Sequence, residues 1–291
     1  MSKCKLIVNK LSGNADKVAD LSEVEQLLRE KYGEVDKIYI DSDNDVKMKE
    51  EIGGYDALAV CGGDGTLNSA VNAVQGTGLE LVYVPCGTLN DTAKSLRLAK
   101  ELSHTDRRIR RVDMGQIGDT MFAYVLAGGT FTEIGYRTKI GHKKKFKLLA
   151  YLAMVLKTYK IHRIKAKITL DGETREGEYT LIMAIKSARC FGFRFNKRFV
   201  HNDGKGQLLL IKSPRFNGIL GKIAIFFPFF RAFFMGLRKP INGKTMYFND
   251  FRQATLEIEG ETDFTVDGEK LVLSGENELK ILRQKLNLVV Y

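Results

Sequence analysis

Short apolar runs alternate with stretches of helical spacing through the first 110 residues of the chain. Between the first two runs, Val18, Leu21, Val24 and Leu28 recur every three or four positions, which predicts a helix over residues 15–32. Short strands separated by helices favour parallel βαβ units in an open, doubly wound α/β sheet. Strands are expected at 5–9, 35–40, 57–61 and 81–85, with further helices ending at 74 and starting near 90.

Beyond residue 110 the pattern changes to β-branched segments joined by turns such as Asp171-Gly172. It predicts an antiparallel second domain, interrupted by one helix at 147–159. The strand-like end of the chain could return to the first domain from about residue 280. We therefore expect an α/β domain at 1–118 and a β domain at 119–280. The strands of the second pattern are expected at 111–117, 121–127, 165–170, 177–186, 207–212, 254–259 and 264–266.

The composition is that of a folded protein, with 291 residues of which 44% are hydrophobic. No uncharged apolar run approaches the roughly 18 residues of a spanning helix, and the start of the chain has no signal-peptide pattern. Its four cysteines, Cys4, Cys61, Cys86 and Cys190, are far apart and form no C-x-x-C pair. We therefore expect no zinc site, reduced thiols and a cytoplasmic location.

The charge is distributed unevenly along the chain. Residues 1–118 carry a net charge of −3, whereas residues 119–291 carry +14. This asymmetry indicates that the second part meets a polyanion, which could be nucleic acid, an anionic membrane or a phosphorylated ligand.

Two glycine-rich segments follow predicted strands and precede predicted helices. They are Gly62-Gly63-Asp64-Gly65-Thr66-Leu67-Asn68 and Pro85-Cys86-Gly87-Thr88-Leu89-Asn90-Asp91. Glycine lets the backbone approach a ligand closely, and the free N–H groups at a helix start favour a phosphate. In an open parallel sheet both segments lie at the carboxyl edge, so together they indicate a nucleotide site. The chain has neither a Walker A sequence nor the protein-kinase motifs.

At these residues the chain resembles the diacylglycerol kinase catalytic family, in particular its small bacterial members. Both glycine segments match family signatures, and the resemblance extends over nearly the whole chain. Shorter matches lie at 9–13, 112–115, 202–204 and 266–269, in the family's order. The chain departs from the family pattern at Lys10, Ser69 and Leu89.

The resemblance implies a Rossmann-like ATP-binding domain, an antiparallel β-sandwich domain and an active site in the cleft between them. It implies an acidic network with Mg²⁺ formed by Asp64, Asp91, Asp113 and Asp267. It also implies a second, structural Mg²⁺ at Asp203, helped by backbone oxygens near Val200 and Lys205. The residues assigned to ATP are Asn9, Ser12, Gly13, Gly62, Gly63, Asp64, Gly65, Thr66, Asn68 and Thr88.

Phosphoryl transfer needs Mg²⁺, a positioned hydroxyl and a carboxylate to accept its proton. Scattered aspartates suit Mg²⁺, which prefers hard oxygen ligands. The candidate bases are Asp267, which the resemblance favours, and Glu269. An Asp-Gly pair otherwise indicates a hairpin turn; we expect one at Asp171-Gly172 but not at Asp267-Gly268.

These features predict an ATP- and Mg²⁺-dependent lipid kinase, with diacylglycerol as the acceptor and phosphatidic acid as the product. The alternatives are another lipid acceptor (a sphingoid base, ceramide, a glycolipid or phosphatidylglycerol) and a soluble-substrate enzyme of the NAD kinase type. A nucleic-acid-binding module is the least favoured reading, because an acidic cleft repels phosphate without a metal. A homodimer is compatible with the sequence.

Residues 219–240 contain six phenylalanines together with cations. Pro228 is expected to divide this segment into two short helices. In the second of them, Arg231, Met235 and Arg238 share one stripe, and Phe233 and Phe234 lie on the other side. The aromatic side could face an anionic membrane, which would make the protein peripherally membrane-associated, or it could pack in the core.

Overall fold

A computed structural model describes residues 2–12, 21–41, 45–96, 110–130, 161–190 and 192–290 of the chain. The predicted helix 147–159, Gly13 and the start of the predicted helix 15–32 lie outside the described residues. Strands and helices alternate through the first region, and the strands predicted there are confirmed. They are β1 (Lys3–Asn9), β2 (Glu34–Ile40), β3 (Ala57–Gly62) and β4 (Glu80–Pro85), with α1 (Leu21–Tyr32), α2 (Asp45–Glu51), α3 (Asp64–Ala73) and α4 (Asp91–Ser95).

The strands of this first region pair in parallel in the order β2-β1-β3-β4. Successive side chains point to opposite faces of a strand, and both faces are buried here. In β1, Ile7 joins one apolar cluster, whereas Leu6 and Val8 join another on the opposite face. This burial on both faces explains why the strands are continuous apolar runs, and it leaves the ends of the strands for polar groups.

The second region is built from antiparallel pairs. Its strands are β5 (Arg110–Ile117), β6 (Thr120–Phe122), β7 (Val125–Gly129), β8 (Ile164–Leu170), β9 (Glu173–Ile185), β10 (Gly206–Lys212), β11 (Ile241–Asn242), β12 (Met246–Phe251), β13 (Gln253–Val266) and β14 (Glu269–Val290). The strands β9 and β13 each pair with β8 along one half and with β7 along the other. The sheet therefore folds over on itself and encloses a second apolar core.

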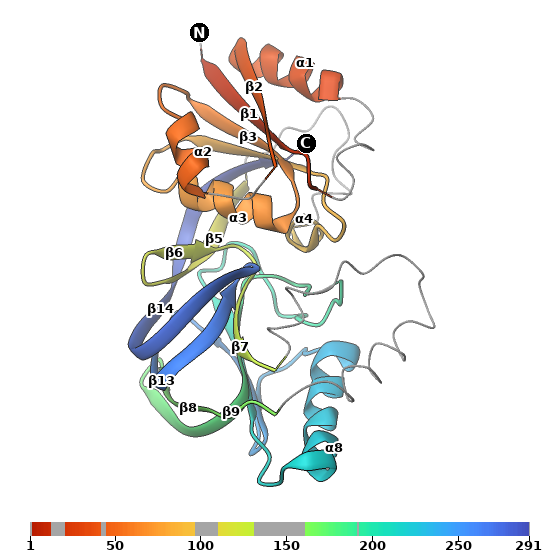
Figure 1. Cartoon of the computed structure of the whole chain (residues 1–291), viewed down its shortest axis with the longest axis vertical. Helices are drawn as coiled ribbons and strands as arrows, with labels where there is room; N and C mark the ends of the chain where they lie inside the picture. The colour runs from red at the N-terminus through yellow and green to blue at the C-terminus, as the bar shows by residue number, and fades with distance from the viewer. Residues whose placement is uncertain are drawn as a thin grey trace.

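The sequence predicted a separate sheet for each region, and this expectation is wrong. The two regions form one 14-stranded sheet because β14 passes through both (Figure 1). Its first half pairs with β13, and its end pairs in parallel with β4 through Leu288–Val290. The register of β14 shifts between Leu282 and Leu286, where Gln284 has a φ of 47°. The chain end is thus part of one long strand and not a separate tail.

The segment rich in phenylalanine differs from its prediction. It is a helix, α8 (Gly218–Phe230), which contains Pro228 and continues into a π-helical turn, η2 (Arg231–Met235). Proline removes one hydrogen bond from a helix without necessarily ending it, and the widened turn begins three residues later. By length and composition, Gly218–Met235 is the described helix that could cross a membrane, contrary to our expectation of none. Its inner face packs against the apolar cluster of β9, β10 and β12.

Candidate active site

Two glycine loops touch each other at the carboxyl ends of β3 and β4. The amides of Cys86 and Gly87 donate to the Gly62 carbonyl at 2.9 and 3.2 Å. A Cβ at Gly87 would lie 2.5 Å from the Gly63 Cα, so glycine is required for this approach of the two backbones. Cys61, at the end of β3, and Cys86, in the second loop, are neighbours, with Cα atoms 6.1 Å apart. The two positions are 25 residues apart in the sequence, and the pairing of β3 with β4 brings them together.

The first glycine loop continues into the start of α3, and β1 supports it from the side. The side-chain amide of Asn9 donates through Nδ2 to Thr66 Oγ1 at 3.0 Å. Its Oδ1 accepts from the backbone amide of Leu11 at 2.8 Å. The first N–H groups of a helix have no acceptor within the helix, and its N-terminus favours an anion. The backbone of Ser12 donates to Asn9, whereas Thr88 is exposed in the second loop. The described residues predicted to contact ATP therefore lie on or near one edge of the sheet. Asn68 is the exception among them, because its side chain faces Met121 and Asp267.

Asp64 connects the two loops. Its carboxylate accepts hydrogen bonds from the backbone amides of Asp91 and Thr92 at 2.9 and 2.8 Å. Asp91 and Thr92 are the first two residues of α4. A carboxylate at a helix N-terminus satisfies N–H groups that would otherwise have no partner. Burial raises the pKa of Asp64, and these two donors oppose the shift. Asp64 thus positions α4 against α3.

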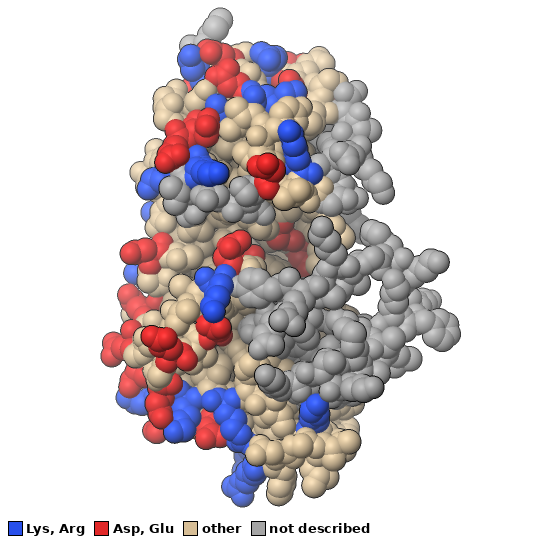
Figure 2. Space-filling view, viewed as in Figure 1, with Lys and Arg blue, Asp and Glu red and all other residues tan. Residues whose placement is uncertain are grey.

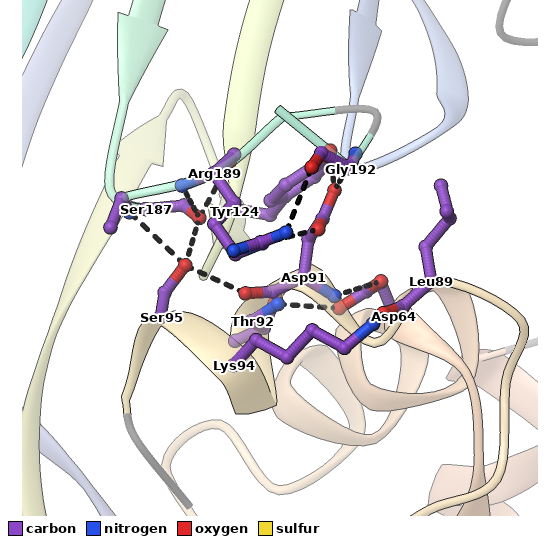
Figure 3. A network of polar contacts seen from close by, with 11 residues as sticks. Asp64, Leu89, Asp91, Thr92, Lys94, Ser95, Tyr124, Ser187, Arg189 and Gly192 are labelled. Carbon is purple, nitrogen blue, oxygen red and sulfur yellow. Dashed lines mark hydrogen bonds and ion pairs between the residues drawn. The ribbon is translucent and has the colours of Figure 1, made fainter. Parts of the chain in front are cut away.

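Asp91 is fully buried and accepts hydrogen bonds from the second region of the chain (Figure 3). Its Oδ2 accepts from the Gly192 amide at 2.7 Å and from the Tyr124 hydroxyl at 3.1 Å. Arg189 forms an ion pair with Oδ1 at 3.3 Å. Burial raises the pKa of Tyr124 well above its usual value, so its hydroxyl keeps the proton that it donates to Asp91.

Asp267 is the third buried carboxylate, and it lies in a two-residue hairpin between β13 and β14. Val266 pairs with Glu269, and Asp267 and Gly268 have φ angles of 49° and 107°. The hairpin that we did not expect here is therefore present, as it is at Asp171-Gly172. Both central positions of such a turn need a positive φ, which Asp and Gly tolerate.

The carboxylate of Asp267 is surrounded by donors. Its Oδ2 accepts from the Ala123 amide at 2.8 Å, and its Oδ1 accepts from Tyr124 and Val125 at 3.1 and 2.6 Å. In the orientation that satisfies its neighbours, the Asn68 side chain donates to Oδ2 at 3.1 Å. Burial raises the pKa of Asp267 to about 7, and the N–H donors keep it from rising further. All four lone pairs of this carboxylate have a donor from the protein itself.

The structure connects three of the predicted acidic residues through hydrogen bonds to shared residues. Tyr124 contacts Asp91 through its hydroxyl and Asp267 through its amide, and Asp64 adjoins Asp91. Asp113 belongs to a different set of contacts, with Gly204 and Lys186, and is described below. Glu269 is exposed at the first position of β14.

Several residues around the three carboxylates were not found from the sequence. The hydroxyl groups of Ser95, in α4, and Ser187 lie 2.7 Å apart, and the Ala188 amide donates to Ser95 at 3.1 Å. Arg189 continues this contact to Asp91. None of these residues belongs to a recognisable motif, and only their tertiary positions reveal the connection between α4 and the segment after β9.

No group of three or more His, Cys, Asp or Glu side chains in the described part of the chain is arranged to hold a metal ion. Mg²⁺ commonly binds through one or two carboxylates, waters and substrate phosphates instead. Asp64 is partly accessible and is the first residue of α3. Its oxygens fit such a partial site, with phosphates supplying the remaining ligands.

A family model described as "Diacylglycerol kinase catalytic domain" matches residues 3–117, which contain both glycine loops and Asp113. This match places residues 3–117 in the diacylglycerol kinase catalytic-domain family. The expected family is confirmed, and the chain is a phosphotransferase that, as a kinase of this family, uses ATP.

Similar proteins support this assignment over most of the chain. A Streptococcus pneumoniae protein named "Putative lipid kinase" is 24% identical over 99% of this chain and 98% of its own. A diacylglycerol kinase of Bacillus subtilis is 26% identical over 74% of this chain and 71% of its own. A diacylglycerol kinase structure from Bacillus anthracis str. Sterne covers 99% of this chain and 96% of its own, with a TM-score of 0.71 at 21% identity. The structural likeness concerns the fold.

The contact between the glycine loops predicts the effect of a single methyl group. Gly87→Ala would push Gly63 away from the second loop, because its Cβ would lie 2.5 Å from the Gly63 Cα. We expect at least about tenfold weaker ATP binding, measured by isothermal titration calorimetry. Gly53→Ala is the matched control, because a Cβ there meets nothing within 4 Å. Equal ATP affinities of the two variants would show that the loop contact does not shape the nucleotide site.

The raised pKa of Asp267 predicts a pH-dependent stability. Because the folded-state pKa of about 7 exceeds that of the unfolded chain, this carboxyl group destabilises the fold progressively as the pH rises from about 4 to 7. Between pH 4.5 and 7.5, the free energy of unfolding of wild type should fall relative to that of Asp267→Asn by on the order of 3 kcal/mol. Urea unfolding measures it, with the exposed Asp263→Asn as control. A pH-independent difference would contradict the shift.

Proposed function

We propose that this chain transfers the terminal phosphoryl group of ATP to the primary hydroxyl of diacylglycerol and so forms phosphatidic acid. The observation that carries the proposal is the meeting of Asp64 and Asp91, from the two glycine loops, with Asp267 from the opposite region. The relatives named as diacylglycerol kinases support this choice of acceptor. In this proposal residues 1–118 form the Rossmann-like nucleotide domain and residues 119–280 receive the lipid.

The phosphates of ATP are proposed to lie at the start of α3, where the helix N-terminus favours negative charge. Gly62, Gly63 and Gly65 let the backbone approach them, and the contact between Asn9 and Thr66 fixes the neighbouring loop. Mg²⁺ supplies neutralisation of the phosphate charge when it is bound. Asp64 would hold it together with the phosphates, directly or through water.

The base that accepts the hydroxyl proton is proposed to be Glu269. A general base needs a lone pair that can reach the proton. Each oxygen of Asp267 already accepts from two donors of the chain, so accepting a lipid hydroxyl would require breaking one of these bonds. Glu269 is exposed two residues later in the same hairpin. Asp267 would then hold residues 123–125 in place.

Substitution separates the two carboxylates. We expect Glu269→Gln to lower kcat by about 10²–10⁴-fold while ATP affinity stays unchanged, because only proton acceptance is lost. Glu276→Gln, an exposed glutamate on the same strand, is the matched control. Near-normal turnover of Glu269→Gln, with a folded but inactive Asp267→Asn, would return the role to Asp267.

The acceptor itself is tested with radiolabelled ATP and a panel of hydroxyl compounds, with the products separated by chromatography. Diacylglycerol should give the dominant product. A dominant product from a sphingoid base, ceramide, a glycolipid or phosphatidylglycerol would replace the acceptor but keep the lipid kinase. Label transferred to NAD instead would contradict the proposed substrate class.

Access to a lipid is proposed to depend on the outer face of α8. Ile219, Leu220, Ile223, Phe227 and Phe230 recur on one side of this helix, and Ile219 and Phe227 are 74% and 66% exposed. Figure 2 shows a largely uncharged surface at the end of the molecule where α8 lies. An exposed apolar face of this kind commonly marks an interaction site.

The phenylalanines that the sequence suggested for this role lie differently. Phe233 stacks on Phe229 and contacts the tilted ring of Phe195, with ring centroids 6.1 and 5.0 Å away, and it packs against the buried cluster. Phe234 contacts Phe230 and Phe193. Phe233 therefore packs on the core, whereas Phe234 is half-buried beside the exposed Phe230, and another face of the helix is exposed.

Cations accompany the exposed face of α8. Arg194, Lys197 and Arg238 line a cavity of about 450 Å³, and Lys197 donates to the carbonyl of Met235 at 3.0 Å, at the end of η2. Each Lys or Arg near the surface of an anionic bilayer contributes about 1 kcal/mol to the free energy of membrane binding. An apolar helix face with cations at its end suits the headgroup boundary of an anionic membrane, so we propose peripheral membrane association.

A double substitution tests this face. Ile223→Ser/Phe227→Ser should bind vesicles containing anionic phospholipid at least about tenfold more weakly in co-sedimentation, because each apolar side chain contributes roughly 1.5–3 kcal/mol on burial. The melting temperature should stay close to that of wild type, since both side chains are exposed. Val272→Ser, an exposed apolar residue on β14, is the control. Unchanged vesicle binding would rule out this face as the membrane contact.

A further inference from the structure

The side chain of Lys186, which directly follows β9, ends in a buried cage of oxygen atoms. Its Nζ lies 2.7 Å from the carbonyl oxygen of Lys205 and 3.5 Å from that of Val200. Asp113 Oδ2 is the third oxygen, at 3.5 Å, and only 1% of the lysine side chain is exposed. The Phe199 ring adds its face, with its centroid 5.7 Å from Nζ. The three hydrogens of an ammonium group match these three acceptors.

The cage has the negative charge that a buried cation needs. Asp113 is buried, and its oxygens also accept from the amides of Gln284 and Gly204 at 2.8 and 2.6 Å. Asp203 adds a second carboxylate next to Gly204. Burial lowers the pKa of Lys186, and Asp113 and Asp203 oppose that shift. A buried charge is tolerated only when it is paired and hydrogen-bonded, and Lys186 is both.

These are the atoms that the resemblance assigned to a second Mg²⁺, namely Asp203 and backbone oxygens near Val200 and Lys205. Mg²⁺ requires about six oxygen ligands at roughly 2.0–2.1 Å. The Nζ atom of Lys186 lies within hydrogen-bonding reach of the Lys205 carbonyl, and two cations this close repel each other strongly in a protein interior. The residues present therefore do not fit a metal ion while the lysine holds this position.

We propose that the ammonium group of Lys186 takes the place of a structural metal ion in this chain. It is a cation carried by the chain itself, which joins β5 through Asp113 to the loop at residues 200–205. The Lys186 amide also donates to the Tyr124 carbonyl at 3.0 Å, so the same residue secures the segment that leads to Arg189 and Asp91. This inference goes beyond the proposed function and does not depend on the identity of the acceptor.

Counting bound Mn²⁺ tests the proposal on the folded protein without nucleotide. Wild type and Asp203→Asn should bind the same number of Mn²⁺ ions per chain by electron paramagnetic resonance titration, because Asp203 holds no metal. Wild type binding one ion more than Asp203→Asn would overturn the proposal. This comparison leaves Lys186 in place, so it remains decisive if substitutions of the lysine fail to fold.

Removal of the ammonium group is the second test. Lys186→Met keeps an unbranched apolar stem but leaves Asp113 without its cation, so the melting temperature in EDTA should fall by about 10 °C. Lys212→Met is the matched control, because Lys212 is an exposed lysine at the end of β10, and it should change the melting temperature by no more than about 2 °C. A Lys186→Met variant that melts with wild type would overturn the proposal.

Discussion

The need to satisfy buried carboxylates is the constraint that joins the parts of this molecule. Asp64, Asp91, Asp113 and Asp267 are all buried or partly buried, and an ionised carboxyl group away from water is costly unless donors surround it. Each of them takes donors from a segment distant in the sequence. Asp267 takes its donors from residues 123–125, and Asp113 takes one from Gln284. The chain must bring these segments together to bury the acids at all.

The same hydrogen bonds divide the acidic residues by role. Asp64 and Asp91 lie where the glycine loops of the matched region meet the segment after β9. Asp267 is enclosed by amides, which suits a group that fixes geometry better than one that exchanges a proton. Asp113 faces a lysine in a neighbouring cage. Acidic residues that look equivalent in a motif list thus have different surroundings, and the surroundings determine what each can do.

The long strand β14 and the helix α8 relate this site to the rest of the protein. β14 pairs with strands of both regions, so the hairpin that carries Asp267 and Glu269 is continuous with the strand that ends beside β4. Movement between the two regions would have to bend this strand. At the other end of the molecule, α8 buries one face against the sheet and exposes another apolar face.

The sequence by itself determined the features that depend on neighbouring residues. Short continuous apolar runs predicted the strands of the first region, and the Gly62–Asn68 signature led to the correct family. These signals are local because backbone conformation and close approach depend on the residue at that position. The turn at Asp171-Gly172 was predictable for the same reason.

The tertiary structure alone decided which distant groups meet. The proximity of Cys61 and Cys86, the ammonium group of Lys186 in a cage of oxygens and the donors around Asp267 have no local pattern. The exposed side of α8 was likewise undecided, since an apolar face fits a core or a membrane equally well until its neighbours are known. Burial and hydrogen bonding are properties of the surroundings, and those surroundings come from distant segments, as Gln284 does for Asp113, 171 residues away.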